Sequence, residues 1–198
     1  MTGIILAGGL GIRLHRDKTF LKVGGLPVIE RMLKVMRDLF KSIIIVTNTP
    51  EPFKTLGAIT IPDKIPRKGS LVGLYSGLLA SPAHFSFVFA CDMPFLNPSL
   101  IRHMMERVGK ADALVPKIKG EFEPLHAIYS RNCIEPICRL IDKNDMRILN
   151  FYPDISLVVM EEDEIKMLDP EGLAFFNINT KEDLSIARKI AHKHDKKD

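Results

Sequence analysis

A glycine-rich turn followed by cations stands near the start of the chain, and these residue types can hold phosphate groups. The apolar run 4–7 leads into 8–11, which contains three glycines, and Arg13, Arg16 and Lys18 follow. Because glycine has no Cβ, backbone N–H groups can converge on an anion there, and the cations then neutralise its charge. We therefore expect the segment to bind a phosphorylated ligand; the alternative is an ordinary glycine turn with surface cations.

Two familiar phosphate-binding motifs are not met by this turn. It lacks the GxxxxGK[ST] spacing of a P-loop, and its GxG lacks the third glycine of the dinucleotide fingerprint. The ligand class must therefore be inferred from other parts of the chain as well.

A carboxylate follows a second apolar run, where a metal ligand could stand. Asp92 follows the run 87–90, with only Cys91 between them. Magnesium typically takes one or two carboxylates together with phosphate oxygens and water, so Asp92 is a natural ligand. The competing interpretation is an aspartate that caps the following turn.

Short apolar runs alternate with helical patterns and predict the elements that position these residues. In the first half we expect strands at 2–7, 42–47, 58–61 and 85–91, a helix from about Pro27, and a helix with Asn97 as N-cap and Pro98 at its first position. The strands are apolar almost throughout, which is typical of a parallel sheet covered on both faces. The expected fold is a three-layer α/β/α arrangement.

The second half is less regular. We expect strands at 113–116, 125–129 and 156–160, helices at 132–142 and 146–151, and a last helix capped by Thr180 that runs to about 191. The acidic run 161–164 could imitate a metal site, but we expect it to be a solvated loop or turn. No repeat or linker divides the chain, so we expect one domain, 1–198, with the last few residues as a disordered charged tail.

Ligands of open α/β sheets bind outside the carboxyl ends of the strands. We therefore expect the segments 8–18, 62–73 and 91–95 to meet around one crevice. The second of these carries Asp63, and Ser70 is expected to cap the helix that follows it.

Composition narrows the classes of protein. The 198 residues include 28 basic and 24 acidic residues, a net charge of only +4, and aromatic residues are 7% with no Trp, which argues against nucleic-acid binding. Three cysteines without CxxC spacing argue against a disulfide framework or a zinc knuckle, and no apolar stretch is long enough for a membrane span. We expect a soluble, cytoplasmic protein.

Taken together, the motifs resemble those of the molybdenum cofactor guanylyltransferase family. Residues 6–9 (LAGG), Arg13 and the pair 17–18 (DK) look like the LAGG-x3-R-x3-DK signature of that family. Residues 69–73 correspond to its GPLAG, 91–94 to its CDxP and 177–184 to its NxNTPEDL. The wider resemblance is to nucleotidyltransferases with a Rossmann-like nucleotide-diphospho-sugar transferase fold, which has a mostly parallel central sheet with an antiparallel element in the second half.

The resemblance implies transfer of GMP from GTP to the terminal phosphate of molybdopterin, with release of pyrophosphate. It implies Mg²⁺ as cofactor, held by Asp92, and Arg13, Lys18 and Asp92 as the catalytic residues. The implied GTP-binding residues are Leu6, Ala7, Gly8, Gly9, Lys18, Asp63 and Asp92.

The acceptor half of the implied site leaves alternatives open. Asn177 and Asn179 are implied contacts of the pterin, with a simple turn before Thr180 as the alternative, and His126 either binds a substrate phosphate or is a structural histidine. The implied partners are GTP, molybdopterin, and transiently the proteins that make the cofactor or receive it.

The chain departs from the family pattern at several positions. His15 stands where glycine is usual, Ser70 and Val72 replace proline and alanine of GPLAG, and the asparagine expected after the second strand is not cleanly matched, so we do not expect Asn48 to contribute. Three alternatives stay open: a cytidylyltransferase for the same pterin, a transferase for a sugar or alcohol phosphate, and an accessory module that binds nucleotide without turnover. Pyrophosphate release with different nucleotides separates them.

Overall fold

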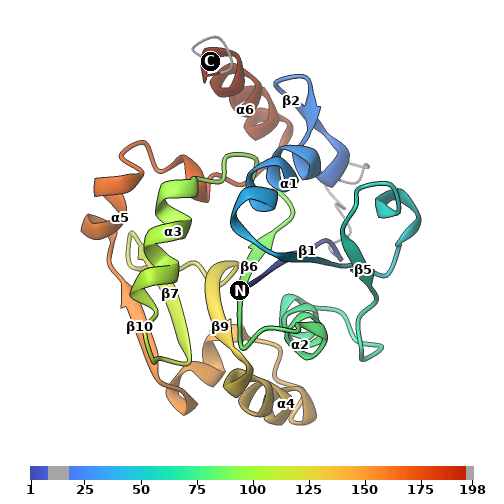
Figure 1. Ribbon diagram of the computed structural model, residues 1–198, viewed down its shortest axis with the longest axis vertical. Helices are drawn as coiled ribbons and strands as arrows, with labels where there is room; N and C mark the ends of the chain where they lie inside the picture. Colours follow the sequence, from blue (N-terminus) through green and yellow to red (C-terminus); the bar gives the residue numbers. More distant parts are fainter. Residues whose placement is uncertain (9–17, 195–198) are drawn as a thin grey trace.

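A mixed sheet forms the middle of the molecule. In the computed structural model, which describes residues 1–8 and 18–194, eight strands form this sheet (Figure 1). They are β1 Thr2–Leu6, β4 Ser42–Val46, β5 Ile59–Ile61, β6 Phe85–Ala90, β7 Ala113–Ile118, β8 Glu121–Phe122, β9 His126–Ser130 and β10 Leu157–Met160. Their order is β10-β7-β9-β6-β1-β4-β5, with β8 beside β7; β2 Lys22–Val23 and β3 Leu26–Pro27 form a separate hairpin.

Strand direction follows the expected pattern. β1 runs parallel to β4 and β6, β4 runs parallel to β5, and β10 runs parallel to β7, whereas β9 is antiparallel to both β6 and β7. Leu6 is opposite Val46 on one side and Ala90 on the other. The carboxyl ends of β1, β4, β5 and β6 therefore lie at one edge of the sheet, and the expectation of a mostly parallel sheet with an antiparallel element in the second half is confirmed.

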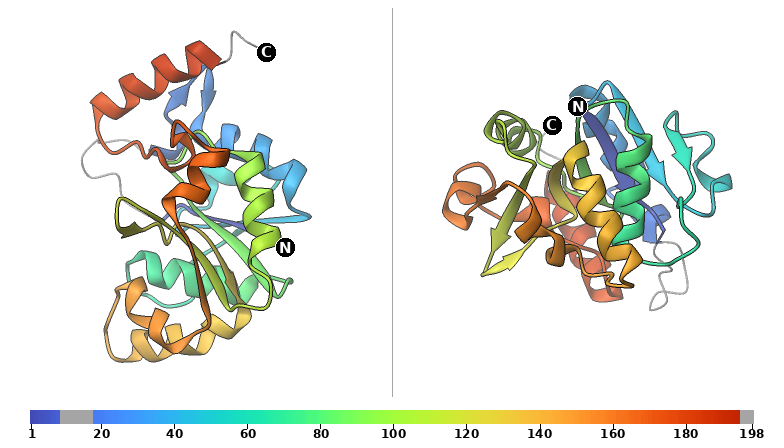
Figure 2. Two further views of the ribbon diagram at one scale, coloured as in Figure 1. Left: turned by 90° about the vertical axis from the view of Figure 1, so that its left-hand side faces the viewer. Right: turned by 90° about the horizontal axis from the view of Figure 1, so that it is seen from below.

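Helices cover both faces of the sheet (Figure 2). On one face, buried side chains of α1 Val28–Leu39, α3 Pro98–Arg107, α5 Glu162–Leu168 and α6 Lys181–His194 pack with those of the sheet. On the other face are α2 Ser70–Ala80, α4 Ile134–Asp142 and the 3-10 helix η4 Ile148–Asp154. The three-layer α/β/α prediction is therefore confirmed. None of the helices in the described residues is long and apolar enough to cross a membrane.

The starts of two helices test the predicted caps. The side chain of Asn97 accepts hydrogen bonds from the N–H groups of Ser99 and Leu100, at 3.0 and 3.1 Å, so the predicted cap of α3 is confirmed. The predicted cap of α2 is wrong, because the helix already begins at Ser70 and Gly69 is its N-cap. Gly69 has φ of +145°, which a residue with a side chain rarely adopts, so glycine fixes this start.

The acidic run 161–164 is also not the solvated loop or turn that its charge suggested. Glu161 is the N-cap of α5, and the next three acids form the first turn. Negative side chains stabilise a helix there because the N-terminal N–H groups carry partial positive charge. Glu164 also accepts a hydrogen bond from His103 of α3 at 2.8 Å, if His103 carries its proton on Nε2, and pairs with Arg107.

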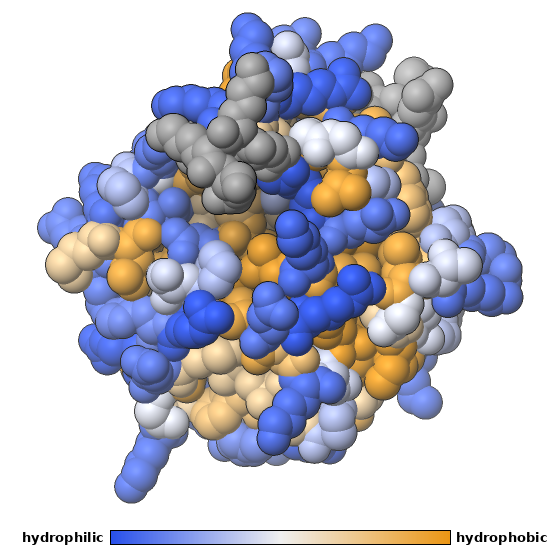
Figure 3. Space-filling model, turned by 45° about the horizontal axis from the view of Figure 1, so that its top comes forward, coloured by the Kyte–Doolittle hydropathy of each residue, from blue (hydrophilic) through white to orange (hydrophobic). Residues whose placement is uncertain are grey.

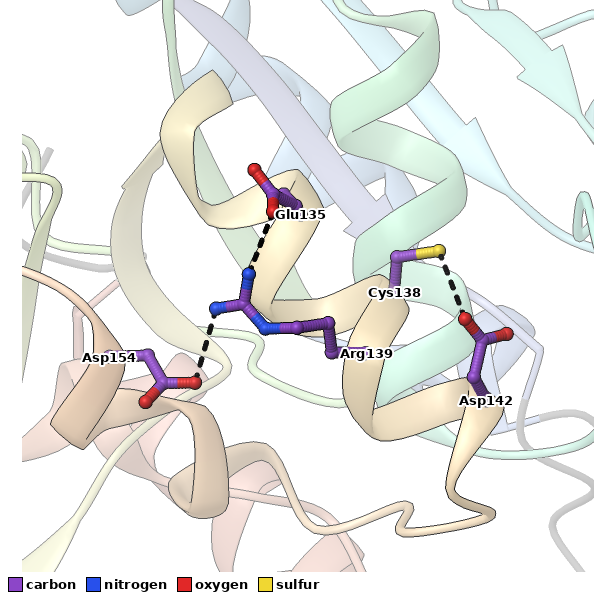
Figure 4. A network of polar contacts seen from close by, with 5 residues as sticks. All are labelled: Glu135, Cys138, Arg139, Asp142 and Asp154. Atoms are coloured by element: carbon purple, nitrogen blue, oxygen red, sulfur yellow. Dashed lines mark hydrogen bonds and ion pairs between the residues drawn. The ribbon is translucent and has the colours of Figure 1, made fainter.

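On the opposite face, α4 is joined to η4 by charge. Arg139 forms ion pairs with Glu135 of α4, at 2.9 Å, and with Asp154 of η4, at 3.3 Å (Figure 4).

The segment 146–151 was expected to be a helix. Most of it belongs to the 3-10 helix η4. The last helix, α6, extends beyond the expected end at 191 to His194, and the rest of the charged tail lies outside the described residues.

Candidate active site

The carboxyl ends of β1 and β5 bring several of the predicted nucleotide-binding residues together. A Cβ added to Gly8 would lie 3.9 Å from Oδ2 of Asp63, and one added to Gly73 would lie 3.8 Å from Oδ1 of Asp63. The same Cβ on Gly73 would lie 3.4 Å from Cδ2 of Leu6. Leu6, Gly8 and Asp63 are therefore neighbours, as expected for one crevice, and Ala7 is fixed there by its N–H bond to the Val46 carbonyl at 2.8 Å.

Asn48 holds Asp63 in place, although the sequence reasoning set this asparagine aside. Its Nδ2 donates to Oδ2 of Asp63 at 2.7 Å, and its Oδ1 accepts from the Asp63 backbone N–H at 3.0 Å. Burial raises the pKa of Asp63, and the bond from Asn48 opposes this rise. The position of Asn48 in the sequence could have indicated this role. Asn48 stands two residues after β4, which is the strand next to both β1 and β5.

Two long-range hydrogen bonds hold the segment that follows Asp63. The N–H of Lys64 donates to Oγ of Ser76 in α2 at 2.8 Å. Arg67 Nη1 donates to the carbonyl of Ile141, near the end of α4, at 2.6 Å. The loop between β5 and α2 is therefore attached to both helices of that face.

The predicted metal ligand lies beside the predicted pterin segment. Asp92 is partly buried just beyond β6, and its backbone carbonyl accepts a hydrogen bond from the N–H of Ile178 at 3.0 Å. Ile178 lies between Asn177 and Asn179, the two asparagines of the closing motif. The fold therefore brings together two motifs that are far apart in the sequence.

The asparagines themselves occupy a turn before α6. Asn177 Nδ2 donates to the carbonyl of Phe175 at 3.2 Å. Oδ2 of Asp183 accepts from the N–H groups of Asn179 and Thr180, and Thr180 Oγ1 accepts from the N–H of Asp183 at 3.1 Å. This reciprocal pairing is a capping box and confirms Thr180 as the cap of α6.

His126 is placed differently from a phosphate ligand. Its side chain has no exposed surface and is surrounded by the rings of Phe87, Phe89 and Phe175. Burial lowers the pKa of His126 to about 3, so the ring is neutral near pH 7. This position does not support direct contact between His126 and a substrate phosphate.

The remaining predicted phosphate-binding residues are only partly covered. Gly9 and Arg13 lie outside the described residues, and Lys18 is described by its backbone, as the first residue of the 3-10 helix η1 Lys18–Phe20. Among residues 1–8 and 18–194, no three His, Cys, Asp or Glu side chains lie together as a metal cluster. Because Mg²⁺ needs only one or two carboxylates when phosphate oxygens complete its shell, Asp92 still fits as its ligand.

A groove of about 680 Å³ lies between α1, the start of α3 and the turn after α5. Leu26, Phe95 and Leu173 contribute apolar surface to it, and the guanidinium of Arg31 lies 5.7 Å from the centre of the Phe95 ring. Figure 3 brings the top of the molecule forward and shows apolar atoms exposed between hydrophilic side chains on this face. Of the predicted nucleotide-binding residues, the described ones (Leu6, Ala7, Gly8, Asp63 and Asp92) do not line the groove.

Relatives of this chain are similar to it over nearly its whole length. A probable molybdenum cofactor guanylyltransferase from Pelotomaculum thermopropionicum is 36% identical, over 96% of this chain and 93% of the relative. A molybdenum cofactor guanylyltransferase from Desulfosudis oleivorans is 35% identical, over 94% of each chain.

Solved structures agree with this similarity. Molybdopterin-guanine dinucleotide biosynthesis protein A from Archaeoglobus fulgidus superposes with a TM-score of 0.85 at 30% identity, over 98% of this chain and 100% of that one. The 2-C-methyl-D-erythritol 4-phosphate cytidylyltransferase from Thermus thermophilus superposes with a TM-score of 0.73 at 18% identity, over 96% and 98% of the two chains, which shows a shared fold.

A sequence model of the MobA-like NTP transferase domain matches residues 3–155, and this segment contains the loops that carry Gly8, Asp63 and Asp92. With that match and the full-length relatives, the chain belongs to the family of MobA-like NTP transferases and is a nucleotidyltransferase.

Proposed function

We propose that this protein transfers GMP from GTP to the terminal phosphate of molybdopterin, releases pyrophosphate and forms molybdopterin guanine dinucleotide. The observation that carries the proposal is that the loops after β1, β5 and β6 start at one edge of the sheet, where Asp63 lies beside Gly8 and where Asp92 is bonded to the Asn177–Asn179 turn. The names of the relatives supply the two substrates. In this proposal residues 1–198 act as one nucleotidyltransferase domain.

The nucleotide side would be formed by the ends of β1 and β5. Leu6, Ala7 and Gly8 would line the guanine and ribose, with Asp63 beside them, and Gly9 would continue the phosphate-binding turn. The N-cap of α2 is a glycine, Gly69, and no side chain caps the first turn. Such a turn can supply N–H groups to a phosphate oxygen.

The chemistry needs no activated side chain, because the attacking group is already an anionic phosphate. The barrier comes from repulsion between two polyanions and from the charge that develops on the leaving pyrophosphate, so positioning and electrostatic stabilisation are what the protein must provide. Lys18 and Arg13 would neutralise the triphosphate. The transfer calls for a divalent metal, and we propose Mg²⁺ with Asp92 as its protein ligand; the bound ion would offset charge on the phosphate oxygens.

The acceptor would lie on the other side of Asp92. The hydrogen bond from Ile178 joins the turn with Asn177 and Asn179 to Asp92, the proposed metal ligand. In this proposal, amide groups of the turn would contact the pterin or its phosphate. We further propose that the protein works in the cytoplasm and meets cofactor-biosynthesis proteins and apo-molybdoenzymes transiently, because the pterin is labile.

Pyrophosphate release tests the proposal. The protein is incubated with Mg²⁺ and GTP, CTP or ATP, with and without molybdopterin. We expect release with GTP only when molybdopterin is present. Tight GTP binding without release under any of these conditions would instead indicate an accessory module that has lost turnover.

A further inference from the structure

Within the described residues, His126 stands out because its polar atoms are buried without hydrogen-bond partners. Both ring nitrogens are buried and have no hydrogen-bond partner, and no other side-chain nitrogen or oxygen in the described residues shares this state. Leaving a buried donor or acceptor unpaired costs about 1–3 kcal/mol for each group. Leucine or phenylalanine would occupy this apolar position without that cost.

The strand register places His126 close to the proposed site. His126 lies opposite Phe89 in the β6–β9 ladder, and Asp92 follows Phe89 by three residues. The carbonyl of Leu125 accepts a hydrogen bond from the N–H of Ala90 at 2.9 Å, so the start of β9 is held against the end of β6.

One segment links the histidine to the metal ligand. The ring of Phe175 packs on His126, with centroids 4.7 Å apart, and the ring of Phe176 contacts Phe95, three residues after Asp92. Ile178 then donates its N–H to Asp92. Phe175 therefore covers His126 at the start of segment 175–178, which also carries Asn177 and is followed by Asn179.

We propose that His126 is a positioning residue for the second substrate, because its unpaired imidazole weakens the packing of Phe175 over β9 and lets segment 175–178 move when the acceptor binds. When Phe175 shifts, one side of the His126 ring becomes accessible. A ring nitrogen of His126 then forms the hydrogen bond that the packing of Phe175 prevents. Asn177 lies on this segment and moves with it. The inference rests on the proposed transfer to an acceptor that binds beside Asp92.

Amide hydrogen exchange, measured in the protein without substrates, tests directly whether His126 promotes the opening of segment 175–178. The Ile178 N–H reports opening of the segment, since its partner is the Asp92 carbonyl. We expect His126→Phe and His126→Leu to slow its exchange about tenfold, as loss of an unpaired polar group stabilises the closed packing. Phe175→Leu, which removes the ring over His126, should speed the exchange. Unchanged or faster exchange in both His126 variants would overturn the proposal.

Steady-state kinetics test the link to the acceptor. We expect His126→Phe to raise KM for molybdopterin about fivefold or more and to leave KM for GTP within about twofold. Ile128→Val is the matched control, because Ile128 is buried two residues further along β9 and carries no polar group. Equal changes in both KM values, or an equal effect of Ile128→Val, would indicate a general packing role instead. Absence of transfer by the unmodified protein would refute the proposed function. The amide exchange rate of the Ile178 N–H would still show whether His126 controls the opening of segment 175–178.

Discussion

The backbone N–H of Ile178 donates a hydrogen bond to the carbonyl oxygen of Asp92 at 3.0 Å. This bond joins the loop after β6 to the turn before α6, although α3, the antiparallel strand β9 and α5 lie between them in the chain. The family domain match ends at residue 155, so half of this pair lies beyond it. The proposed metal ligand and the proposed acceptor contacts therefore depend on each other for their placement.

Charge removal at the proposed catalytic residues should slow the reaction. We expect Lys18→Ala and Asp92→Asn each to lower kcat with GTP at least about tenfold, which corresponds to about 1.4 kcal/mol of lost transition-state stabilisation. Asp154→Asn, at an exposed carboxylate on η4, serves as the control. Near-normal turnover in both site variants would contradict their assigned roles.

Asn48 should matter for nucleotide affinity. Asn48→Ala removes both hydrogen bonds to Asp63, and because the lost side-chain bond opposes the effect of burial, the pKa of Asp63 should rise further. We expect the Kd for GTP, measured by calorimetry, to rise about fivefold to tenfold, the scale of one hydrogen bond.

Asn132→Ala is the matched control for that experiment. Asn132 also donates to an aspartate, Asp112, at 2.7 Å, but this pair lies next to the start of β7 rather than at the nucleotide edge. Equal GTP affinity in the Asn48 variant and the unmodified protein would remove Asn48 from the site.

Two glycines in α2 should respond differently to alanine. A Cβ on Gly77 would lie 2.8 Å from Cγ2 of Ile4 in the core, whereas a Cβ on Gly73 would meet no atom closer than 3.4 Å. We expect Gly77→Ala to lower the free energy of unfolding by about 1–2 kcal/mol, because overpacking outweighs the gain in helix propensity. Gly73→Ala should be neutral or slightly stabilising. Denaturant unfolding of both variants checks this, and equal stability of the two would show that α2 shifts to absorb the methyl group.

Stability should fall in acid because of His126. Its pKa is about 3 in the folded protein against 6.5 when unfolded, so below pH 6.5 the unfolded chain binds a proton that the folded one does not. The contribution is complete above pH 6.5 and is lost as pH falls toward 3. We expect the unmodified protein to lose about 2 kcal/mol between pH 7 and pH 5 relative to His126→Phe. Parallel pH curves for the two proteins would show that His126 is accessible or paired.

Elements with strong local signals could be predicted from the sequence. The apolar runs predicted β1, β4, β5 and β6 to within a residue at each end but not the short hairpin of β2 and β3. Asn97 followed by Pro98 predicted the start of α3, because capping is a local interaction. The prediction for the acidic run 161–164 was wrong because charge alone suggests an exposed loop or turn. The same negative charges also favour the first turn of a helix.

The site was predicted less completely, since its geometry depends on tertiary contacts. The loops containing Gly8, Asp63 and Asp92 could be grouped by the rule for strand ends. The pairing of Asn48 with Asp63 depends on β4 lying next to β5, and the burial of His126 depends on Phe175 from a distant segment. Neither contact leaves a pattern in the neighbouring sequence.

A nucleotide competition experiment tests the central claim most directly. The protein is supplied with Mg²⁺, molybdopterin and equal concentrations of GTP, CTP and ATP, and the dinucleotide product is identified by mass. We predict molybdopterin guanine dinucleotide as the main product, with one pyrophosphate released for each dinucleotide formed. A product carrying cytosine or adenine, or no dinucleotide with any of the three nucleotides, would contradict the account.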